Sequence, residues 1–279
     1  MLKTAIIVQA RMGSRRFPQK MLRPIAGQPM VLCVLDRLSW ALEAKPVILA
    51  TTDLDEDLEL ARVARRHGYI AETVHGDPDD VMARYIKVAE KHKIDVIVRA
   101  TGDCPLIDPV LVDEAITERG HRAVDYVALA REWADGLDVE VFTTDALLAS
   151  RSLTETSQTR SSDREHVTPA IWRDSTRFSS HLIPCPYDLS GQRWCVDTQE
   201  DHLFIDNLYR EVASRHTHFG WREVYNCIQS NAILQQEGRL VSRKNPRNQG
   251  YMASLAKDIG VNHDSTTWDK VRYGENADA

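Results

Sequence analysis

Short apolar runs alternate with amphipathic stretches through the first hundred residues of the chain. The runs are typical of buried strands, and the stretches repeat their apolar positions with the period of a helix. The expected strands are 4–10, 46–51, 70–75 and 94–100, and the expected helices are 30–43, 55–67 and 79–92. This alternation predicts an α/β fold with a mostly parallel central sheet and flanking helices. Ligands of such sheets bind beyond the carboxyl ends of the strands, so the loops after the four strands should border one crevice.

The remainder of the chain predicts a helical appendage after one main domain. The expected units are a main domain over 1–213, the appendage over 214–260 and a polar tail over 261–279. Helical patterns cover 221–229 and 231–237, and Gly238 is expected to end the second helix as its C-cap.

The composition narrows the class of protein. Hydrophobic residues make up 43% and charged residues 27% of the chain, which is ordinary for a globular protein. The net charge of −6 argues against broad nucleic-acid binding, which needs a basic face. The cysteines form no C-x-x-C pair, so reduced thiols are expected. No apolar run approaches the ~20 residues of a membrane span, and we expect no signal peptide. We therefore expect a cytoplasmic protein without membrane insertion.

The loop after the first expected strand carries four cations within ten residues. These are Arg11, Arg15, Arg16 and Lys20. In the same loop, Gly13 lets the backbone approach an anion closely and Ser14 adds a hydroxyl donor. Arginine grips phosphate bidentately and lysine acts as a point charge, so the loop favours a polyphosphate ligand. The alternative is a solvated basic loop without a ligand.

The loop after the fourth expected strand places a carboxylate at the edge where a ligand should bind. Asp103 is the first candidate for a metal ligand, because Mg²⁺ prefers one or two carboxylates together with phosphate oxygens. Alternatively, Asp103 only stabilises the turn. Asp108, which precedes Pro109, is expected to cap the next helix.

Several motifs in order along the chain resemble those of a known family. The first two are Arg11-x-Gly13-Ser14-x-Arg16-x-Pro18-x-Lys20 and Gly102-Asp103-x-Pro105-Leu106, and further matches lie at 76–81, 136–142, 164–168 and 193–201. Together they resemble the cytidylyltransferases that make CMP-activated sugar acids, with the spore-coat polysaccharide biosynthesis protein F group as the nearest branch. The usual pattern has Thr at the position of Arg15 and Gly at that of Gln19.

The resemblance implies a fold and a reaction. The fold is a GT-A-like, Rossmann-like nucleotidyltransferase domain in which a small β extension over 123–180 serves acceptor and dimer contacts. The activity implied is a Mg²⁺-dependent transfer of CMP from CTP to a sugar acid or another anionic acceptor. An acceptor oxygen attacks the α-phosphorus and pyrophosphate leaves, in surface polysaccharide or glycan biosynthesis. A homodimer is also implied.

The resemblance also implies roles for particular residues. The catalytic residues implied are Arg11, Arg16, Lys20 and Asp103. The nucleotide-binding residues implied are Ala10, Arg11, Gly13, Ser14, Arg16, Lys20, Gly76, Asp80, Thr101 and Gly102. The metal ligands implied are Asp103 and Asp197, and the acceptor-binding residues are Asp138, Glu140, Arg164 and His166.

Some of these residues have structural alternatives. Asp197 could be the N-cap of a helix that starts Asp-Thr-x-Glu, and Asp80 could form an i,i+4 ion pair with Arg84. Asp138 and Glu140 alternate with apolar residues, which is also the pattern of a half-buried strand with a solvated face.

Two other functions remain open from the sequence. A glycosyltransferase of related architecture would use a nucleotide sugar and release a nucleoside diphosphate. A non-catalytic protein would bind the nucleotide without turnover. A lone histidine such as His166 could likewise be structural.

Overall fold

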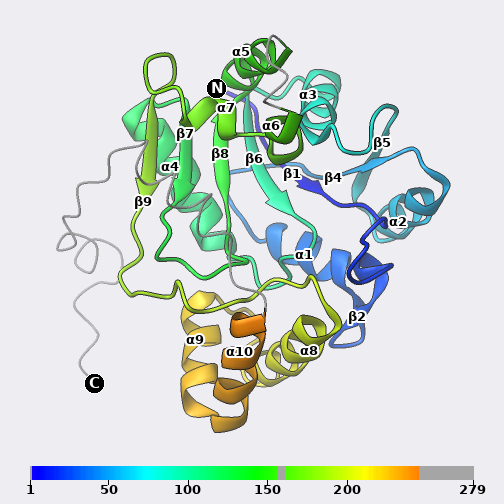
Figure 1. Ribbon diagram of the computed structural model, residues 1–279, viewed down its shortest axis with the longest axis vertical. Coiled ribbons are helices and arrows are strands. Elements are labelled where there is room, and N and C mark those ends of the chain that lie inside the picture. The colour runs from blue at the N-terminus through cyan, green and yellow to red at the C-terminus, as the bar shows by residue number, and fades with distance from the viewer. Residues whose placement is uncertain (1, 156–160, 245–279) are drawn as a thin grey trace.

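Residues 2–155 and 161–244 are described by a computed structural model, in which helices cover both faces of a seven-stranded sheet (Figure 1). The strand order across the sheet is β5-β4-β1-β6-β8-β7-β9. The strands are β1 (Thr4–Gln9), β4 (Val47–Thr52), β5 (Ile70–Val74), β6 (Val96–Thr101), β7 (Tyr126–Leu129), β8 (Glu140–Thr143) and β9 (Ser180–Ile183). A separate antiparallel pair consists of β2 (Pro24–Ile25) and β3 (Gln28–Pro29).

Parallel pairing joins the four strands that the hydrophobic pattern predicts. β4 pairs with β1 and β5, and β1 pairs with β6. β8 runs antiparallel to β6 and β7, and β9 lies parallel to β7. The predicted α/β class with a mostly parallel sheet is therefore confirmed. The β6–β8 register places Arg99 opposite Glu140, a pairing that recurs in the site described below.

Two layers of helices cover the sheet because successive residues of each strand point to opposite faces. The helices are α1 (Met30–Leu38), α2 (Asp55–Arg66), α3 (Val81–His92), α4 (Pro109–Arg122), α5 (Thr144–Glu155), α6 (Ser161–His166), α7 (Pro169–Trp172), α8 (Gln199–Ala213), α9 (Trp221–Ser230) and α10 (Ala232–Lys244), with a 3₁₀ turn η1 (Lys20–Leu22). In β1, Ile6 and Val8 share one core with α1, α2, α4 and α8 to α10. Ala5 and Ile7 share the other core with α3, α5 and α7.

The ends of two expected helices differ from the structure. The helix expected over 30–43 ends at Leu38, where Ser39 donates its hydroxyl to the carbonyl of Asp36 and the chain continues in short turns. Gly238 was expected to be a C-cap, and this was wrong, because α10 continues through it to Lys244. A Cβ built on Gly238 would lie 3.2 Å from the Phe204 ring. This glycine therefore allows α10 to pack closely on α8.

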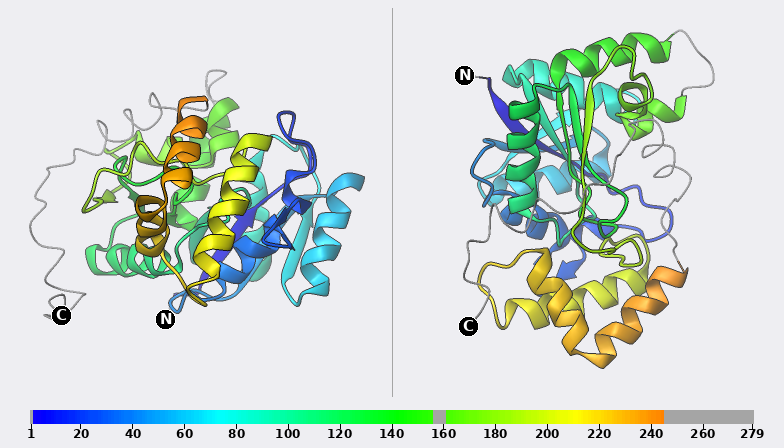
Figure 2. Two further views of the ribbon diagram at one scale, coloured as in Figure 1. Left: turned by 90° about the horizontal axis from the view of Figure 1, so that it is seen from below. Right: turned by 90° about the vertical axis from the view of Figure 1, so that its left-hand side faces the viewer.

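The last three helices lie together at one end of the molecule (Figure 2). They pack on one another and belong to the core that includes α1 and α4. The expected boundary between 213 and 214 falls directly after α8. Asp108 is confirmed as the N-cap of α4, where it accepts a hydrogen bond of 2.8 Å from the Val110 amide. Its other oxygen accepts one of 2.7 Å from the Trp221 amide at the start of α9.

In the described part of the chain, no helix combines the length and the apolar character that a membrane span requires. The expected appendage beyond 244 and the expected tail over 261–279 lie outside the described residues.

Candidate active site

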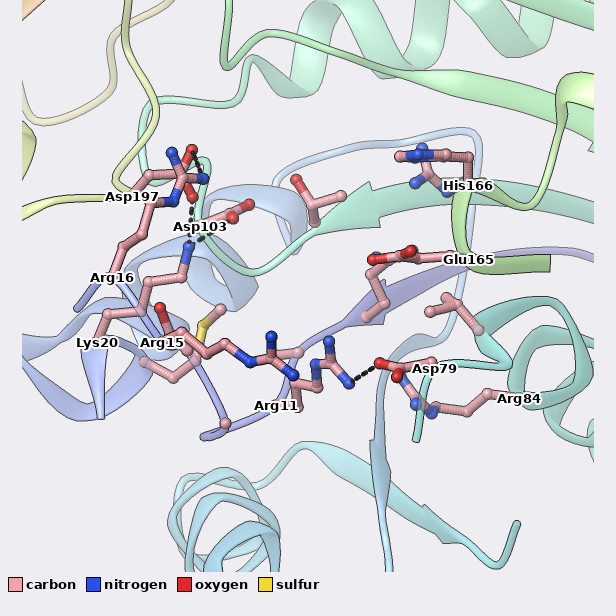
Figure 3. A pocket seen from close by; sticks show the side chains of 18 residues that line it. Arg11, Arg15, Arg16, Lys20, Asp79, Arg84, Asp103, Glu165, His166 and Asp197 are labelled. Carbon is pink, nitrogen blue, oxygen red and sulfur yellow. Dashed lines mark hydrogen bonds and ion pairs between the residues drawn. The ribbon is translucent and has the colours of Figure 1, made fainter. Parts of the chain in front are cut away.

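A cavity of about 560 Å³ lies at the carboxyl ends of β1 and β6, where the strand order predicts a ligand (Figure 3). The loops after β1, β5 and β6 line it, together with the end of α6; in the described residues the loop after β4 supplies none of the lining. Its charged lining is mostly basic. The cations are Arg11, Arg15, Arg16, Lys20, Arg84 and Arg99, and the acids are Asp79, Asp103, Glu165 and Asp197.

Lys20 lies between two carboxylates at one end of the cavity. Its Nζ donates to Asp103 Oδ2 at 2.8 Å, to Asp197 Oδ1 at 2.9 Å and to the Val196 carbonyl at 2.8 Å. Burial by itself lowers the pKa of Lys20, but the two carboxylates outweigh it and hold the pKa above its ordinary value. Lys20 is therefore a fixed positive charge whose position depends on both acids.

Asp197 is the most heavily paired acid of the cavity. Its Oδ2 accepts from Arg193 at 2.8 Å and lies 3.0 Å from an Arg16 nitrogen. Burial alone would raise the pKa of Asp197, but Lys20 and the two arginines hold it at about 2. The alternative that Asp197 caps a helix was wrong, because Thr198 is the N-cap of α8. The Asp197 carboxylate instead faces the cavity (Figure 3).

Sequence reasoning assigned no role to Arg193, although it lies in the matching motif over 193–201. It is buried, and besides Asp197 it donates to Asp135 at 2.6 Å and to Asp201 at 3.1 Å. Asp201 in turn accepts from the amides of Asp197 and Thr198 at 3.0 Å. This network fixes the orientation of the Asp197 carboxylate.

A buried acid that the sequence did not single out fixes the backbone of the basic loop. Asp57, in the first turn of α2, is fully buried and accepts a 2.6 Å hydrogen bond from the Met12 amide. It also pairs with the Thr52 hydroxyl. Ser14 accepts a bond of 3.3 Å from the Phe17 amide, and its side chain lines the cavity.

Gly102 lies outside the cavity lining and packs against Ala10, which lines the cavity at the end of β1. The Gly102 amide donates to the Gln9 carbonyl at 2.9 Å, and a Cβ on Gly102 would lie 2.7 Å from the Ala10 Cβ. Thr101, which precedes it, lines the cavity. Gly102 is therefore required for the close packing of the chain at the ends of β1 and β6. Its nucleotide-binding role stays a prediction.

At the other end of the cavity, Arg11 connects two of the lining loops by hydrogen bonds. Arg11 donates to Asp79 at 2.6 Å and to the Pro78 carbonyl at 3.2 Å, and Arg84 donates to the same carbonyl at 2.7 Å. These bonds join the basic loop to the loop before α3.

Asp80 and Gly76 lie in the same loop but outside the cavity lining. Asp80 is the N-cap of α3, and its carboxylate pairs with Arg151 at 2.7 Å. The expected partner, Arg84, donates to the Pro78 carbonyl. Gly76 has a φ of +145° that suits glycine. Their nucleotide-binding roles stay predictions.

Of the residues expected to bind the acceptor, His166 lines the cavity, together with its neighbour Glu165. They come from the end of α6, directly before Val167, whose φ of +72° is rare for a β-branched residue. Arg164 is half-buried and outside the lining. The roles of Arg164 and His166 in acceptor binding stay predictions.

Glu140 and Asp138 lie outside the cavity lining. Glu140 is buried, pairs with Arg99 and accepts hydrogen bonds of 2.5 Å from Tyr126 and Thr168. The solvated face considered for Glu140 was therefore wrong. Asp138 accepts from the Gly136 amide at 3.0 Å, before β8 begins. Because Arg99 lines the cavity, Glu140 positions a group that a ligand can contact.

Asp103 and Asp197, the two acids beside Lys20, are the residues that would hold a Mg²⁺ ion, and this role stays a prediction. The side chains of Asp103 and Asp197 are 28% and 24% exposed toward the opening. In the described chain, no cluster of three or more His, Cys, Asp and Glu side chains could hold a metal. A magnesium ion here would therefore take its remaining ligands from phosphate oxygens and water, as Mg²⁺ usually does.

Gln19 has the left-handed conformation, with φ +58° and ψ +21°, where the family pattern has Gly. We expect Gln19→Gly to leave the free energy of unfolding unchanged or to raise it by up to ~1 kcal/mol. Relief of about 1–2 kcal/mol of strain is partly offset by the larger conformational freedom of glycine in the unfolded chain. Gln19→Val should lower the stability, because a β-branched residue is strained there. Thermal denaturation measures both, and the reverse order of stability would contradict this reading of the loop.

Comparisons with known proteins give a matching family and a matching fold. A family model described as cytidylyltransferase matches residues 5–218. The spore coat polysaccharide biosynthesis protein SpsF of Bacillus subtilis is 28% identical over 215 residues, which cover 75% of this chain and 87% of that protein. The 3-deoxy-manno-octulosonate cytidylyltransferase of Geobacter sulfurreducens is 38% identical over 110 residues, 39% of this chain and 42% of that enzyme. A solved cytidylyltransferase from Leptospira borgpetersenii superposes with a TM-score of 0.75 at 27% identity, covering 84% of this chain and 97% of that one.

Proposed function

This chain belongs to the cytidylyltransferase family, and we propose that it transfers CMP from CTP to a sugar acid or another anionic acceptor. The chain is a nucleotidyltransferase, and its relatives associate it with sugar biosynthesis. The observation that carries the finer proposal is the end of the cavity where Lys20 lies between Asp103 and Asp197, beside the basic loop. Carboxylates for a metal and cations for phosphates are thus present in one cavity.

The proposed reaction forms a bond between an acceptor oxygen and the α-phosphorus of CTP. The bond from the α-phosphorus to the bridging oxygen breaks, pyrophosphate leaves, and the acceptor hydroxyl releases its proton to water. Arg11, Arg16 and Lys20 would offset the negative charge on the phosphates and on the leaving pyrophosphate. Mg²⁺, held by Asp103 and Asp197, would neutralise phosphate charge when bound. Most of the catalysis then comes from position and electrostatics.

The basic lining supports an anionic acceptor. Arg84 and Arg99 line the cavity beyond the basic loop, and His166 lies across from Arg84 (Figure 3). An acceptor carboxylate would be attracted by the two arginines, because arginine can bind a carboxylate bidentately. The homodimer stays a prediction from the resemblance, and the cytoplasmic location stays a prediction from the composition.

Pyrophosphate release tests the proposal directly. The protein is incubated with Mg²⁺, each of the four ribonucleoside triphosphates, and a panel of sugar acids, sugar phosphates and phosphonates. We expect release with CTP and an anionic acceptor, and loss of release when EDTA removes the metal. Release of a nucleoside diphosphate from a nucleotide sugar would favour a glycosyltransferase. CTP binding without turnover across the panel would favour a non-catalytic protein.

A further inference from the structure

Given the metal-dependent reaction proposed above, we infer that Lys20 acts as an internal counter-ion that makes metal binding conditional on the nucleotide. The Lys20 ammonium pairs with both Asp103 and Asp197, at the place where a divalent cation would join them. The nucleotide must offer Lys20 other acceptors before the metal can take these two carboxylates.

The hydrogen bonds of Lys20 leave it no spare donor. A lysine ammonium has three N–H groups, and here all three have acceptors at 2.8 to 2.9 Å. The side chain is only 7% exposed, so water does not compete freely for these bonds. Lys20 therefore cannot donate to a phosphate while it keeps both carboxylates and the Val196 carbonyl.

The surrounding charges also oppose a metal ion that arrives alone. Asp197 already pairs with Arg16 and Arg193 through its second oxygen, in addition to Lys20. A divalent cation would meet like charges within a few ångströms, where repulsion is strong even at an effective dielectric constant of ~20. The two carboxylates that it could bind are already compensated. Metal binding without a nucleotide should therefore be weak.

Binding of a triphosphate should make metal binding favourable, because it brings negative charge to these cations. Cations outnumber acids in the described lining of the cavity, so the lining attracts an anion more readily than a cation. Phosphate oxygens give Lys20 and Arg16 new partners, which frees Asp103 and Asp197 for the metal. By linkage, the nucleotide should strengthen metal binding by the same factor as the metal strengthens nucleotide binding.

Binding of Mn²⁺ tests this inference without turnover, and is followed by the loss of its free-ion EPR signal beyond the loss that the same CTP causes without protein. The wild-type protein should bind Mn²⁺ weakly alone and at least about tenfold more tightly in the presence of CTP. Lys20→Gln should bind Mn²⁺ alone at least about tenfold more tightly than the wild type, because the competing charge is gone. Lys20→Arg, which keeps the charge, should stay weak. Lys91→Gln, on the exposed end of α3, is the matched control and should behave as the wild type.

Two results would overturn the inference, and they differ in what they say about the function. If the wild type binds Mn²⁺ alone as tightly as it does with CTP, Lys20 does not control the metal, while the proposed reaction is unaffected. If neither the wild type with CTP nor Lys20→Gln binds Mn²⁺, the inference and the metal site of the proposed reaction both fail. Lys20→Met also removes the charge and decides the question if Lys20→Gln does not fold.

Discussion

Replacement of Asp103 by Asn is expected to reduce CTP-dependent turnover by roughly 10²- to 10³-fold or more, with little change in stability. Asn has the same shape and can still accept the Lys20 hydrogen bond, but it removes the negative charge at the opening of the cavity. That charge would hold Mg²⁺ and would keep Lys20 in place. The turnover number from pyrophosphate release, and the melting temperature of the same preparation, measure the two effects separately.

A matched control lies outside the cavity lining. Asp113 is half-buried and accepts hydrogen bonds from the amides of Leu42 and Glu43 through its carboxylate. Asp113→Asn makes the same chemical change and should keep wild-type turnover. If Asp103→Asn retained near-normal activity with the same magnesium dependence, Asp103 would not be a metal ligand.

Replacement of Gly136 by Ala is expected to lower the free energy of unfolding by about 3 kcal/mol or more. Gly136 has a φ of +107°, and a Cβ there would lie 2.5 Å from the Trp194 carbonyl carbon and 2.7 Å from the Cys195 nitrogen. These are backbone atoms, and a 2.6 Å hydrogen bond from the Trp194 amide to the Asp135 carbonyl fixes them. Backbone strain and the forced displacement each cost about 1–3 kcal/mol.

Thermal denaturation of Gly136→Ala should show a melting temperature roughly 6–12 °C below that of the wild type. Gly191 provides the control, because a Cβ there meets no atom within 4 Å and its φ is not in the left-handed region. Gly191→Ala should melt close to the wild type. Equal melting temperatures for the two variants would show that the contact between Gly136 and Trp194 is not tight in solution.

The parallel half of the sheet was predictable because the residue patterns that mark its strands and helices lie within short segments of the chain. Buried strands such as β1 and β4 are continuous apolar runs, and the acidic start and basic end of α2 mark its ends. The reversal at β8 has no such signal, since pairing between β6 and β8 joins residues about forty positions apart. Gly238 was misread because a glycine that packs on Phe204 and a glycine that ends a helix look the same in sequence.

The sequence motifs also predicted which charged residues come together at the Lys20 end of the cavity. The structure brings Lys20, Asp103, Asp197 and Arg16 together from three separate segments, as the motifs imply. Sequence reasoning missed residues whose role depends on burial. Arg193 orients Asp197, but a lone arginine in a motif gives no sign that three carboxylates surround it.

The double cap at Asp108 has a consequence for how the molecule unfolds. One buried carboxylate accepts an amide hydrogen bond from the first turn of α4 and another from the first turn of α9, and the buried Arg37 nearby donates to the carbonyls of Ile107 and Phe219. Melting α9 alone would strip partners from two buried charged groups, which is far costlier than fraying an independent helix. The C-terminal helices and the sheet should therefore form a single cooperative unit, so that protection of their amides against hydrogen exchange is lost together.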